Sequence, residues 1–302
     1  MKVFSPAKLN LSLAVTGRRA DGFHSLVSLV VPLEFGDTLV IEEREEAADV
    51  LSCDQDDIPL GPENLILKAL ALFRRKTGVE RYFSVALQKR IPAGGGFGGG
   101  SGNAVCALKA FNEICGNPEG ERDLREMAEE LGSDCPLFLY SSPVIIRGRG
   151  EDVTVVPGLD AGLGSRCVHL FNPGFASPTG NLFRKMSERG GFTPSAKAEE
   201  AIQVLIESIR AGGPFKGMTN DLGSLLEQKY LVYESLFSEL RENGIFEYGI
   251  TGSGSGAFIL SRSRGERDEV HRILDPLLDR GRFIIETRFG GLNSKDIPKP
   301  SL

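Results

Sequence analysis

A glycine-rich stretch constrains this chain more than any other feature. Six of the seven positions from 94 to 100 are glycine, and Phe97 is the exception. The alternating run at 83–87 before it predicts a strand, and the apolar run at 104–111 after it predicts a helix. Residues without a Cβ let the backbone curl around an oxyanion, and the helix N-terminus adds partial positive charge. The stretch therefore predicts a phosphate cradle, because a flexible linker would not lead directly into an apolar helix.

Two common nucleotide-binding motifs fit this stretch less well. A P-loop requires a lysine directly after a glycine, and none follows here. Gly94, Gly96 and Gly99 match the spacing of the dinucleotide fingerprint, which also needs a second strand and an acidic residue about 20 positions later. The chain at 115–118 is Cys-Gly-Asn-Pro, which is typical of a loop. The dinucleotide interpretation is therefore set aside.

Length and composition narrow the class of protein. A chain of 302 residues suggests two domains or one large domain, and 41% hydrophobic with 25% charged residues is typical of a soluble globular protein. The net charge of −6 provides no basic surface for nucleic acid. No apolar run approaches the roughly 18 residues of a membrane span, and the N-terminus lacks a signal-peptide core. We expect a cytoplasmic protein that binds neither membrane nor nucleic acid.

The cysteines and histidines argue against a zinc site or a disulfide framework. The five cysteines are odd in number, widely spaced and never form C-x-x-C, and the chain has only three histidines. Most of the cysteines are expected to be small core residues in a reducing compartment.

Two short segments carry candidate catalytic residues. The alternation at 5–15 predicts a half-buried strand whose polar face carries Lys8 and Asn10. Asp134 follows a predicted helix at 121–131 that ends at Gly132. Taken alone, Lys8 and Asn10 would ordinarily be explained as part of a solvated strand face, and Asp134 as a turn residue.

Three further segments carry candidate binding residues. An Asp-Gly turn at 21–22 is followed by Phe23 and His24, and the segment at 177–183 contains Thr179 and Phe183. Residues 246–260 predict a strand, a glycine-rich turn with Gly252 and Ser253, and a second strand. Taken alone, His24 would be a capped turn histidine, Phe23 an ordinary core residue, and the segment at 246–260 a glycine-rich hairpin.

Together and in this order, the segments resemble the motifs of the GHMP kinases, the superfamily of galactokinase, homoserine kinase, mevalonate kinase and phosphomevalonate kinase. Residues 92–104 match motif 2 as P-x-x-x-G-[LF]-G-[GS]-[GS]-S-[SG]-[ND]-A, and 251–258 resemble motif 3, although Phe258 falls one position early. The segments P-A-K-L-N at 6–10, D-G-F-H at 21–24 and G-S-D-C-P at 132–136 resemble the branch that phosphorylates 4-diphosphocytidyl-2-C-methyl-D-erythritol. Five ordered motifs are far more specific than one.

The resemblance implies an α+β GHMP kinase fold. The N-terminal domain, at 1–160, would resemble domain 2 of ribosomal protein S5, and the C-terminal domain, at 161–302, would be ferredoxin-like. Their junction is expected in the Gly- and Pro-rich segment at 157–165. The implied reaction is transfer of phosphate from ATP to the 2-hydroxyl of the cytidylyl substrate, in the non-mevalonate isoprenoid pathway.

The resemblance also assigns residues to roles. Lys8 would be catalytic, and Asp134 would be the base. The ATP phosphates would lie against Pro92, Ala93, Gly94, Gly95, Gly96, Phe97, Gly98, Gly99, Gly100, Ser101, Gly102 and Asn103. The substrate would contact Asn10, Phe23, His24, Thr179, Phe183, Gly252 and Ser253. Mg²⁺ is expected with ATP, but the sequence identifies no protein ligand for the metal and leaves the oligomeric state open.

Two alternatives remain on the sequence alone. Another GHMP kinase, such as a homoserine or mevalonate kinase, would lack the P-A-K-L-N and D-G-F-H segments. A non-catalytic nucleotide-binding module would be expected to have lost Lys8 or Asp134, and both are present.

The remaining expectations concern secondary structure. We expect two strands at 26–31 and 38–41 separated by a turn at 34–37, and an acidic loop at 42–57. We expect helices at 64–78 (capped by Asn64), 196–210 (capped by Ser195), 224–242 and 266–278, a strand at 283–287, and a disordered tail at 293–302.

Overall fold

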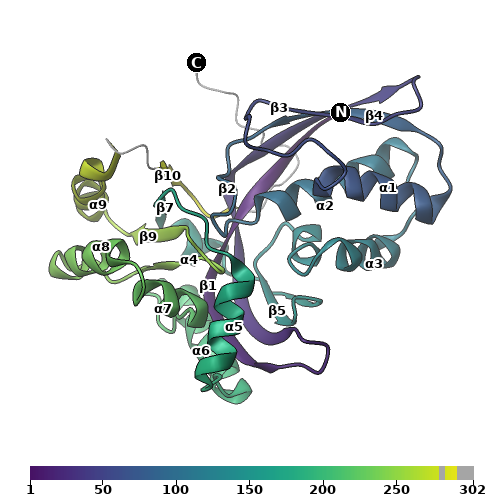
Figure 1. Ribbon diagram of the computed structural model, residues 1–302. Coiled ribbons are helices and arrows are strands. Elements are labelled where there is room, and N and C mark those ends of the chain that lie inside the picture. Colours follow the sequence, from purple (N-terminus) through teal and green to yellow (C-terminus); the bar gives the residue numbers. More distant parts are fainter. Residues whose placement is uncertain (279–282, 291–302) are drawn as a thin grey trace.

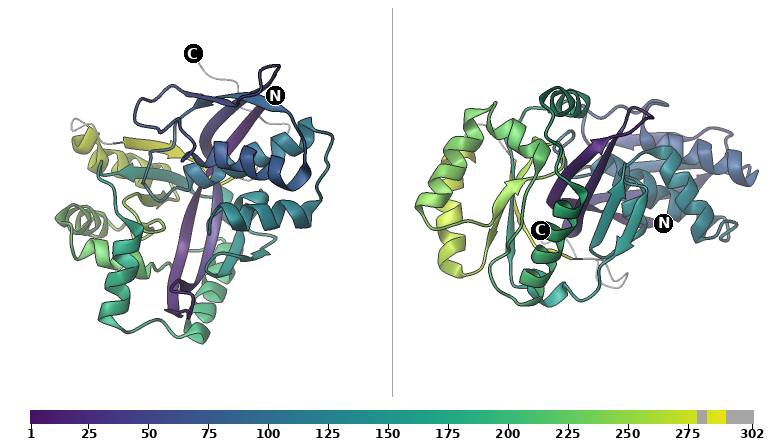
Figure 2. Two further views of the ribbon diagram at one scale, coloured as in Figure 1. Left: turned by 45° about the vertical axis from the view of Figure 1, so that its right-hand side comes forward. Right: turned by 90° about the horizontal axis from the view of Figure 1, so that it is seen from below.

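The computed structural model describes residues 1–278 and 283–290, so the expected disordered tail lies outside the described residues. The long ribbon of β1 (Lys2–Arg18) and β2 (His24–Arg44) runs through the middle of the molecule (Figure 1). On one side of this ribbon lie the helices α1 (Leu65–Thr77), α2 (Gly99–Ile114) and α3 (Glu121–Leu131), and on the other lie α7 (Asp221–Glu227), α8 (Leu231–Glu242) and α9 (Arg264–Leu278). The view from below shows the same division (Figure 2). The strands form two sheets, and the ribbon itself belongs to the first of them.

The first sheet has six strands. Beside β1 and β2 it contains β3 (Val50–Cys53), β4 (Tyr82–Gln88), β5 (Val144–Gly148) and β6 (Asp152–Val155). The order is β3-β4-β2-β5-β6, and β1 pairs antiparallel with β2. The expected acidic loop at 42–57 is wrong in part, because β2 extends to Arg44 and β3 pairs with β4.

The expected turn at 34–37 is also wrong, because β2 is one continuous strand. Its residues 26–30 pair with β5, and its residues 38–44 pair with β4. Between these halves the register with β1 shifts, since Pro6 pairs with Gly36 but Lys8 pairs with Pro32. A Cβ on Gly36 would lie 2.2 Å from the carbonyl oxygen of Ser5. Gly36 therefore serves a close approach of two strands at a bulge.

The expected strand at 5–15 is confirmed as part of β1, but the expectation that it is half-buried is wrong, because both of its faces are buried. Leu9 and Leu11 face the hydrophobic core, while Lys8, Asn10 and Ser12 on the other face are also buried. The second face is covered because the glycine-rich loop and the loop after β8 (Tyr248–Ile250) contact it. Buried polar groups are tolerated only when they are hydrogen-bonded, and the polar side chains of this face do form hydrogen bonds.

Helices α1 (Leu65–Thr77), α2 (Gly99–Ile114) and α3 (Glu121–Leu131) belong to the first sheet's side, with the short 3₁₀ helix η1 (Pro136–Leu139). The expected ends of α1 are confirmed. The side chain of Asn64 accepts a hydrogen bond from the backbone of Ile66, and Gly78 adopts the left-handed conformation. Phe73 of α1 and Phe111 of α2 pack with Phe83 of β4 in one core.

The second sheet has four antiparallel strands: β7 (Cys167–Asn172), β8, β9 (Ala257–Ser261) and β10 (Phe283–Thr287). Its order, β10-β7-β9-β8, places the last strand beside the first and the third beside the second, which is the ferredoxin-like arrangement. Its helices are α4 (Asp160–Gly164), α5 (Thr179–Arg189), α6 (Ser195–Arg210), α7 (Asp221–Glu227), α8 (Leu231–Glu242) and α9 (Arg264–Leu278). The expected α+β class and the ferredoxin-like arrangement of the C-terminal strands are confirmed.

Two helix expectations on this side are wrong. The segment expected as one helix at 224–242 is broken into α7 and α8 at 228–230. The backbone of Tyr230 is extended there, and its ring lies 4.4 Å from that of Phe175, so tertiary packing turns the chain. Ser195 does not cap α6, because the helix begins at Ser195 itself and Pro194 occupies the cap position without a side-chain hydrogen bond.

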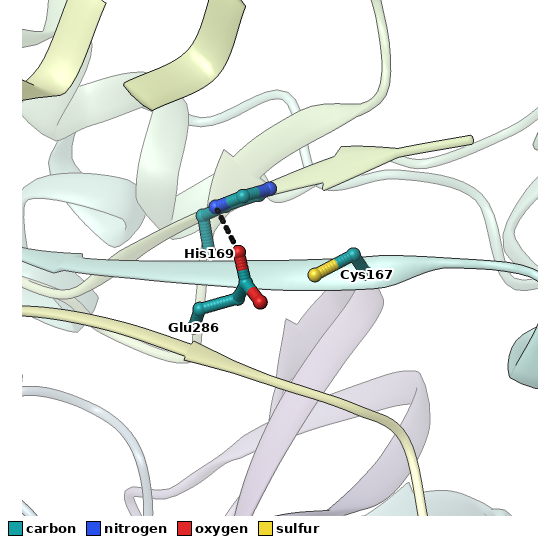
Figure 3. Close-up of side chains that lie close together, drawn as sticks. All are labelled: Cys167, His169 and Glu286. Carbon is teal, nitrogen blue, oxygen red and sulfur yellow. Dashed lines mark ion pairs between the residues drawn. The ribbon is translucent and has the colours of Figure 1, made fainter. Parts of the chain in front are cut away.

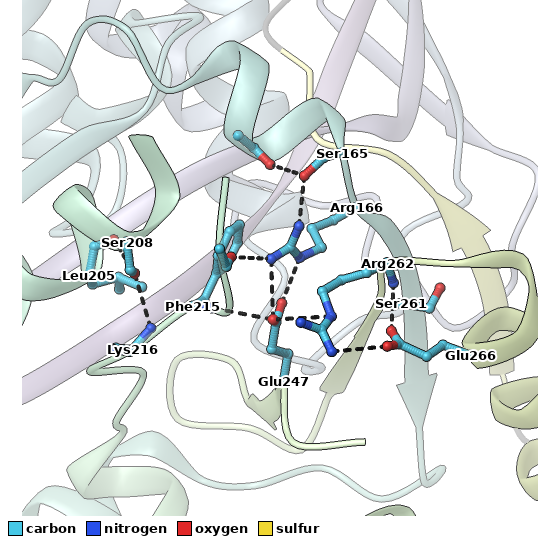
Figure 4. Close-up of polar contacts among 12 residues, drawn as sticks. Ser165, Arg166, Leu205, Ser208, Phe215, Lys216, Glu247, Ser261, Arg262 and Glu266 are labelled. Atoms are coloured by element: carbon cyan, nitrogen blue, oxygen red, sulfur yellow. Dashed lines mark hydrogen bonds and ion pairs between the residues drawn. The ribbon is translucent and has the colours of Figure 1, made fainter. Parts of the chain in front are cut away.

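A buried ion pair joins the segments that flank the second sheet (Figure 4). Nε of Arg166 lies 2.6 Å from Oε2 of Glu247, and Nη2 lies 3.2 Å from Oε1. Arg166 also donates to the carbonyl of Gly213, and Glu247 accepts from the backbone N–H of Phe215. These contacts satisfy both buried charges.

Across the helices that the structure describes, none combines the length and apolar character needed to cross a lipid bilayer.

Candidate active site

The glycine-rich loop connects β4 to α2, as the sequence predicts. Gly94, Gly96 and Gly98 have φ values of +68°, +77° and +79°, a region that favours glycine. A Cβ on Gly96 would lie 2.4 Å from the carbonyl oxygen of Thr251, and the backbone N–H of Gly256 donates to the carbonyl of Gly95 at 2.9 Å. The loop after β8 therefore supports the glycine-rich loop and sets its shape.

A cavity of about 600 Å³ opens against this loop and the first turn of α2. Every residue assigned to the ATP phosphates lines it except Gly102, which packs against Ser5 and Phe138 inside α2. Asn103 lines the cavity, but its amide donates to Oδ2 of Asp37 at 2.9 Å. Backbone N–H groups at a helix N-terminus form a site for anions, so the cavity suits a polyphosphate.

Lys8 lies at the floor of this cavity in a hydrogen-bonded network. Its Nζ donates to Oδ1 of Asn10 at 2.6 Å and lies 3.8 Å from Oδ2 of Asp134. Asn10 in turn donates to Ser28 at 2.8 Å, and Thr251 donates to Oδ1 of Asn10 at 3.3 Å. Burial lowers the pKa of Lys8 below its ordinary value, and the carboxylate of Asp134 opposes this shift. The structure thus brings together three residues that the sequence separates by up to 126 positions.

Asp134 stands where two cavities meet. The second cavity, of about 740 Å³, lies beside the first, and Asp134 lines both. The turn that holds it follows the end of α3, where the backbone N–H of Cys135 donates to Gly132. The side chain of Asp134 is 49% exposed while that of Lys8 is 5% exposed, so the carboxylate is open to a ligand and the ammonium faces it from within.

The second cavity contains the predicted aromatic residues. Phe23 and Phe183 both line it, although Phe183 stacks on His24, with ring centroids 4.9 Å apart and an interplanar angle of 24°. Phe23 is half exposed, and the guanidinium of Arg149 lies 5.3 Å from its ring centroid. Burial and the nearby Arg18 lower the pKa of His24, so its ring is neutral at pH 7. The two phenylalanines belong to one cavity but do not stack on each other.

The other predicted substrate residues lie at the edge between the cavities. Thr179 and Phe183, both on α5, line both cavities, and Gly252 and Ser253 line the first. The hydroxyls of Thr179 and Ser253 lie 2.7 Å apart, which joins α5 to the loop after β8.

Sequence reasoning missed several residues that support the site. Lys89 lines the first cavity, and its ammonium lies 2.7 Å from Oδ2 of the fully buried Asp37. Oδ1 of Asp37 accepts from the backbone N–H groups of Arg90 and Ile91, which anchors the start of the loop. Asn220 donates to the carbonyls of Ile250 and Gly252. The sequence predicts Asp37 only as a turn residue, and its complete burial is what distinguishes it from an ordinary turn aspartate.

Comparisons with known proteins agree with this geometry. Residues 64–142 match the GHMP kinases N terminal domain, and residues 202–276 match the GHMP kinases C terminal domain. The 4-diphosphocytidyl-2-C-methyl-D-erythritol kinase of Arabidopsis thaliana, a chloroplastic protein, is 33% identical over 96% of this chain and 74% of its own length. The enzyme of that name from Chromobacterium violaceum is 33% identical over 89% of both chains.

Solved structures give the same result. A crystal structure of 4-(cytidine 5'-diphospho)-2C-methyl-D-erythritol kinase covers 97% of this chain and 100% of its own, with a TM-score of 0.75 and 27% identity. A homoserine kinase from Cytophaga hutchinsonii, at 17% identity and a TM-score of 0.70, shares the fold. The chain therefore belongs to the GHMP kinases, small-molecule kinases that use ATP as phosphoryl donor, and within them to the 4-diphosphocytidyl-2-C-methyl-D-erythritol kinase family.

Proposed function

We propose that this enzyme transfers the γ-phosphoryl group of ATP to the 2-hydroxyl of 4-diphosphocytidyl-2-C-methyl-D-erythritol. The observation that carries the proposal is the position of Asp134. Its carboxylate lines both the cavity of the glycine-rich loop and the cavity of the aromatic residues, 3.8 Å from Nζ of Lys8. A base at this junction can reach a hydroxyl held in one cavity while the phosphoryl donor occupies the other.

Only a few residues take part in the proposed reaction. The hydroxyl oxygen attacks the γ-phosphorus, its proton passes to Asp134, and ADP leaves. The ammonium of Lys8 stabilises the negative charge that develops on the transferred group. Backbone N–H groups from Gly94 to Ser101 bind the phosphates. Preorganised charges in a partly buried site are effective because they need little rearrangement during the reaction.

Magnesium is expected to enter with ATP. The hydroxyl of Ser101 and the carboxylate of Asp134 are oxygen donors of the kind that Mg²⁺ prefers, and both line the phosphate cavity. When bound, the ion would neutralise phosphate charge.

The second cavity suits the cytidine diphosphate part of the substrate. Phe23 and the His24–Phe183 stack offer flat surfaces for a base, while Arg18 and Arg149 offer positive charge for a diphosphate. The place where the methylerythritol would meet ATP is bordered by Asn10, Thr179, Gly252 and Ser253.

All five cysteines are free thiols, which supports a reducing compartment such as the cytoplasm.

An ADP-release assay with three acceptors tests the proposal. The purified enzyme receives MgATP with the cytidylyl substrate, homoserine or mevalonate. We expect turnover with the cytidylyl substrate alone, because only this acceptor fills the aromatic cavity. Faster turnover with homoserine or mevalonate would assign the chain to another activity of the superfamily. ATP binding without turnover on any acceptor would favour a nucleotide-binding module.

A further inference from the structure

A single buried carboxylate joins both ends of the glycine-rich stretch. Asp37 on β2 is fully buried. Its Oδ1 accepts hydrogen bonds from the backbone N–H groups of Arg90 and Ile91, at 2.7 Å and 2.8 Å, where the chain has just left β4. Its Oδ2 accepts from Nδ2 of Asn103 at 2.9 Å, where the chain has entered α2. The carboxylate therefore binds the chain both before and after the glycines of the loop.

The strand register explains why Asp37 can reach both ends. The pairing of β2 with β4 ends at Thr38 and Gln88, so Asp37 is the next residue of β2. Beyond Gln88 the chain leaves the sheet, and the side chain of Asp37 replaces a strand carbonyl as the acceptor for the next backbone N–H groups. Buried N–H groups need an acceptor, so this replacement sets the path of the chain into the loop.

Lys89 balances the buried charge. Its Nζ lies 2.7 Å from Oδ2 of Asp37 and also donates to the carbonyl of Ile91, and its side chain is 8% exposed. A Cβ on Gly99, the first residue of α2, would lie 3.0 Å from this ammonium. A positive charge at a helix N-terminus is unfavourable on its own, and the carboxylate offsets it. Asp37 thus holds the lysine against the first turn of α2, at the edge of the phosphate cavity.

The segment between these attachments has a composition that favours flexibility. Seven of the eleven residues at 92–102 are glycine. Glycine loses more conformational freedom on ordering than any other residue, so a loop with loose ends would bind phosphate at a high entropic cost. Fixing both ends on a strand of the first sheet before ATP arrives reduces that cost.

Other carboxylates with several partners act elsewhere in the molecule. Glu286 faces His169 on the neighbouring strand of the second sheet (Figure 3). Asp49, whose side chain is 12% exposed, accepts from the backbone N–H of Phe83 at 3.0 Å and pairs with Arg74. Two partners of Asp37, the side chains of residues 89 and 103, line the phosphate cavity, and none of the described partners of Glu286 or Asp49 does. Asp49 is therefore a suitable control for Asp37.

We propose that Asp37 is a positioning residue for ATP, which fixes both ends of the glycine-rich stretch in the shape that accepts the phosphates. This inference rests on the proposed function, because it takes residues 94–101 as the binding site of those phosphates. Asp37 is not among the residues that line the cavity, so it acts through Lys89, Asn103 and the loop backbone. An apolar residue would fill the same space at a lower desolvation cost, but it would leave the two ends unjoined.

Asp37→Ala and Asp49→Ala form the matched pair that tests this role. Each removes a carboxylate that accepts from a backbone N–H group and pairs with a basic side chain, so each should lower the melting temperature. Only Asp37→Ala should raise the Kd for MgATP, titrated without an acceptor, by roughly tenfold or more, while the KM for the cytidylyl substrate changes less than about threefold. Hydrogen exchange without nucleotide should accelerate at 94–101 in Asp37→Ala and stay unchanged there in Asp49→Ala.

Asp37→Asn separates the contributions of the two carboxylate oxygens. Its amide oxygen still accepts from the backbone N–H groups of Arg90 and Ile91, but its amide nitrogen cannot accept from Lys89. The Kd for MgATP should therefore rise by roughly threefold or more, yet less than in Asp37→Ala. If Asp37→Ala does not fold, this conservative variant carries the same comparison with Asp49→Ala.

The inference is overturned if the folded Asp37 variants bind MgATP as the wild type does, if hydrogen exchange at 94–101 is unchanged, or if Asp49→Ala weakens MgATP binding equally. A wild-type enzyme that binds no MgATP would instead contradict the proposed function. Because the exchange rates are measured without nucleotide, they test the role of Asp37 in holding the loop independently of that function.

Discussion

At the scale of single residues, the site depends on a buried ammonium that faces a partly exposed carboxylate. Because burial lowers the pKa of Lys8, its charge costs stability at every pH below that pKa, and the cost is relieved as pH rises toward the unfolded value. We predict that Lys8→Met abolishes turnover yet raises the free energy of unfolding by about 1 kcal/mol. Oδ1 of Asn10 would keep the hydrogen bond from Thr251. Thermal melts without ligands check this, and a lower melting temperature would contradict it.

The carboxylate itself gives a second prediction. Asp134→Asn should lower kcat by roughly 100-fold or more, because the amide cannot accept the hydroxyl proton, while ATP affinity stays near that of the wild type. The change should also lower the pKa of Lys8 further, since the carboxylate now raises it. Single-turnover kinetics, nucleotide titration and NMR titration of the lysine measure these effects. Near-normal turnover in the folded variant would exclude Asp134 as the base.

At the scale of elements, two glycines of the glycine-rich stretch, one at the cap of α2 and one in its first turn, should respond differently to the same substitution. A Cβ on Gly98 would lie 2.5 Å from Phe138 and 2.9 Å from Lys8, at a φ of +79°. Gly98→Ala should therefore lower both the melting temperature and kcat, because it strains the backbone and displaces the lysine. A β-branched valine at this position would add to the same strain and weaken ATP binding as well.

Gly100→Ala is the matched variant. Gly100 lies in the first turn of α2, lines the phosphate cavity, and would place a Cβ no nearer than 3.9 Å to Leu65. We predict an unchanged or higher melting temperature, since alanine favours a helix, together with a raised KM for ATP. The KM for the cytidylyl substrate should change much less. An unchanged KM for ATP would show that phosphate does not approach the backbone here.

At the scale of the whole molecule, the cavity that we propose for the cytidylyl substrate draws its aromatic residues from distant parts of the chain. Phe23 and His24 lie at the turn between β1 and β2, whereas Phe183 comes from α5. We predict that Phe183→Ala raises the KM for the cytidylyl substrate roughly 10-fold or more, because one base-stacking contact contributes about 1–3 kcal/mol. The KM for ATP should stay the same. An equal rise in both KM values would place Phe183 beside the wrong nucleotide.

His24 extends this prediction to the choice of base. Stacking cannot distinguish cytosine from uracil, since discrimination needs hydrogen bonds to the base edge. His24→Ala should therefore narrow the preference for cytidine over uridine analogues, and it should also loosen Phe183, on which His24 stacks. Comparing kcat/KM for the two analogues measures the effect. Ser187→Ala, which removes only the hydroxyl 2.6 Å from Nε2 of His24, should produce a smaller change.

The sequence alone determined the features that depend on neighbouring residues. The glycine-rich loop between β4 and α2, the ends of α1 and the order of the motifs follow from glycine content, capping residues and periodicity. These patterns involve residues only a few positions apart, so they predict a helix, strand or loop correctly whenever the tertiary structure allows it to form. The resemblance carried by five such segments also predicted the family.

Only the tertiary structure decided which residues meet. It made β2 continuous through Gly36, buried both faces of β1, and broke the helix at 228–230. It also placed Asp134 at the junction of two cavities and brought Glu286 to Cys167 and His169. Strand register, burial and side-chain contact depend on partners far away in the chain, and local periodicity carries no information about those partners.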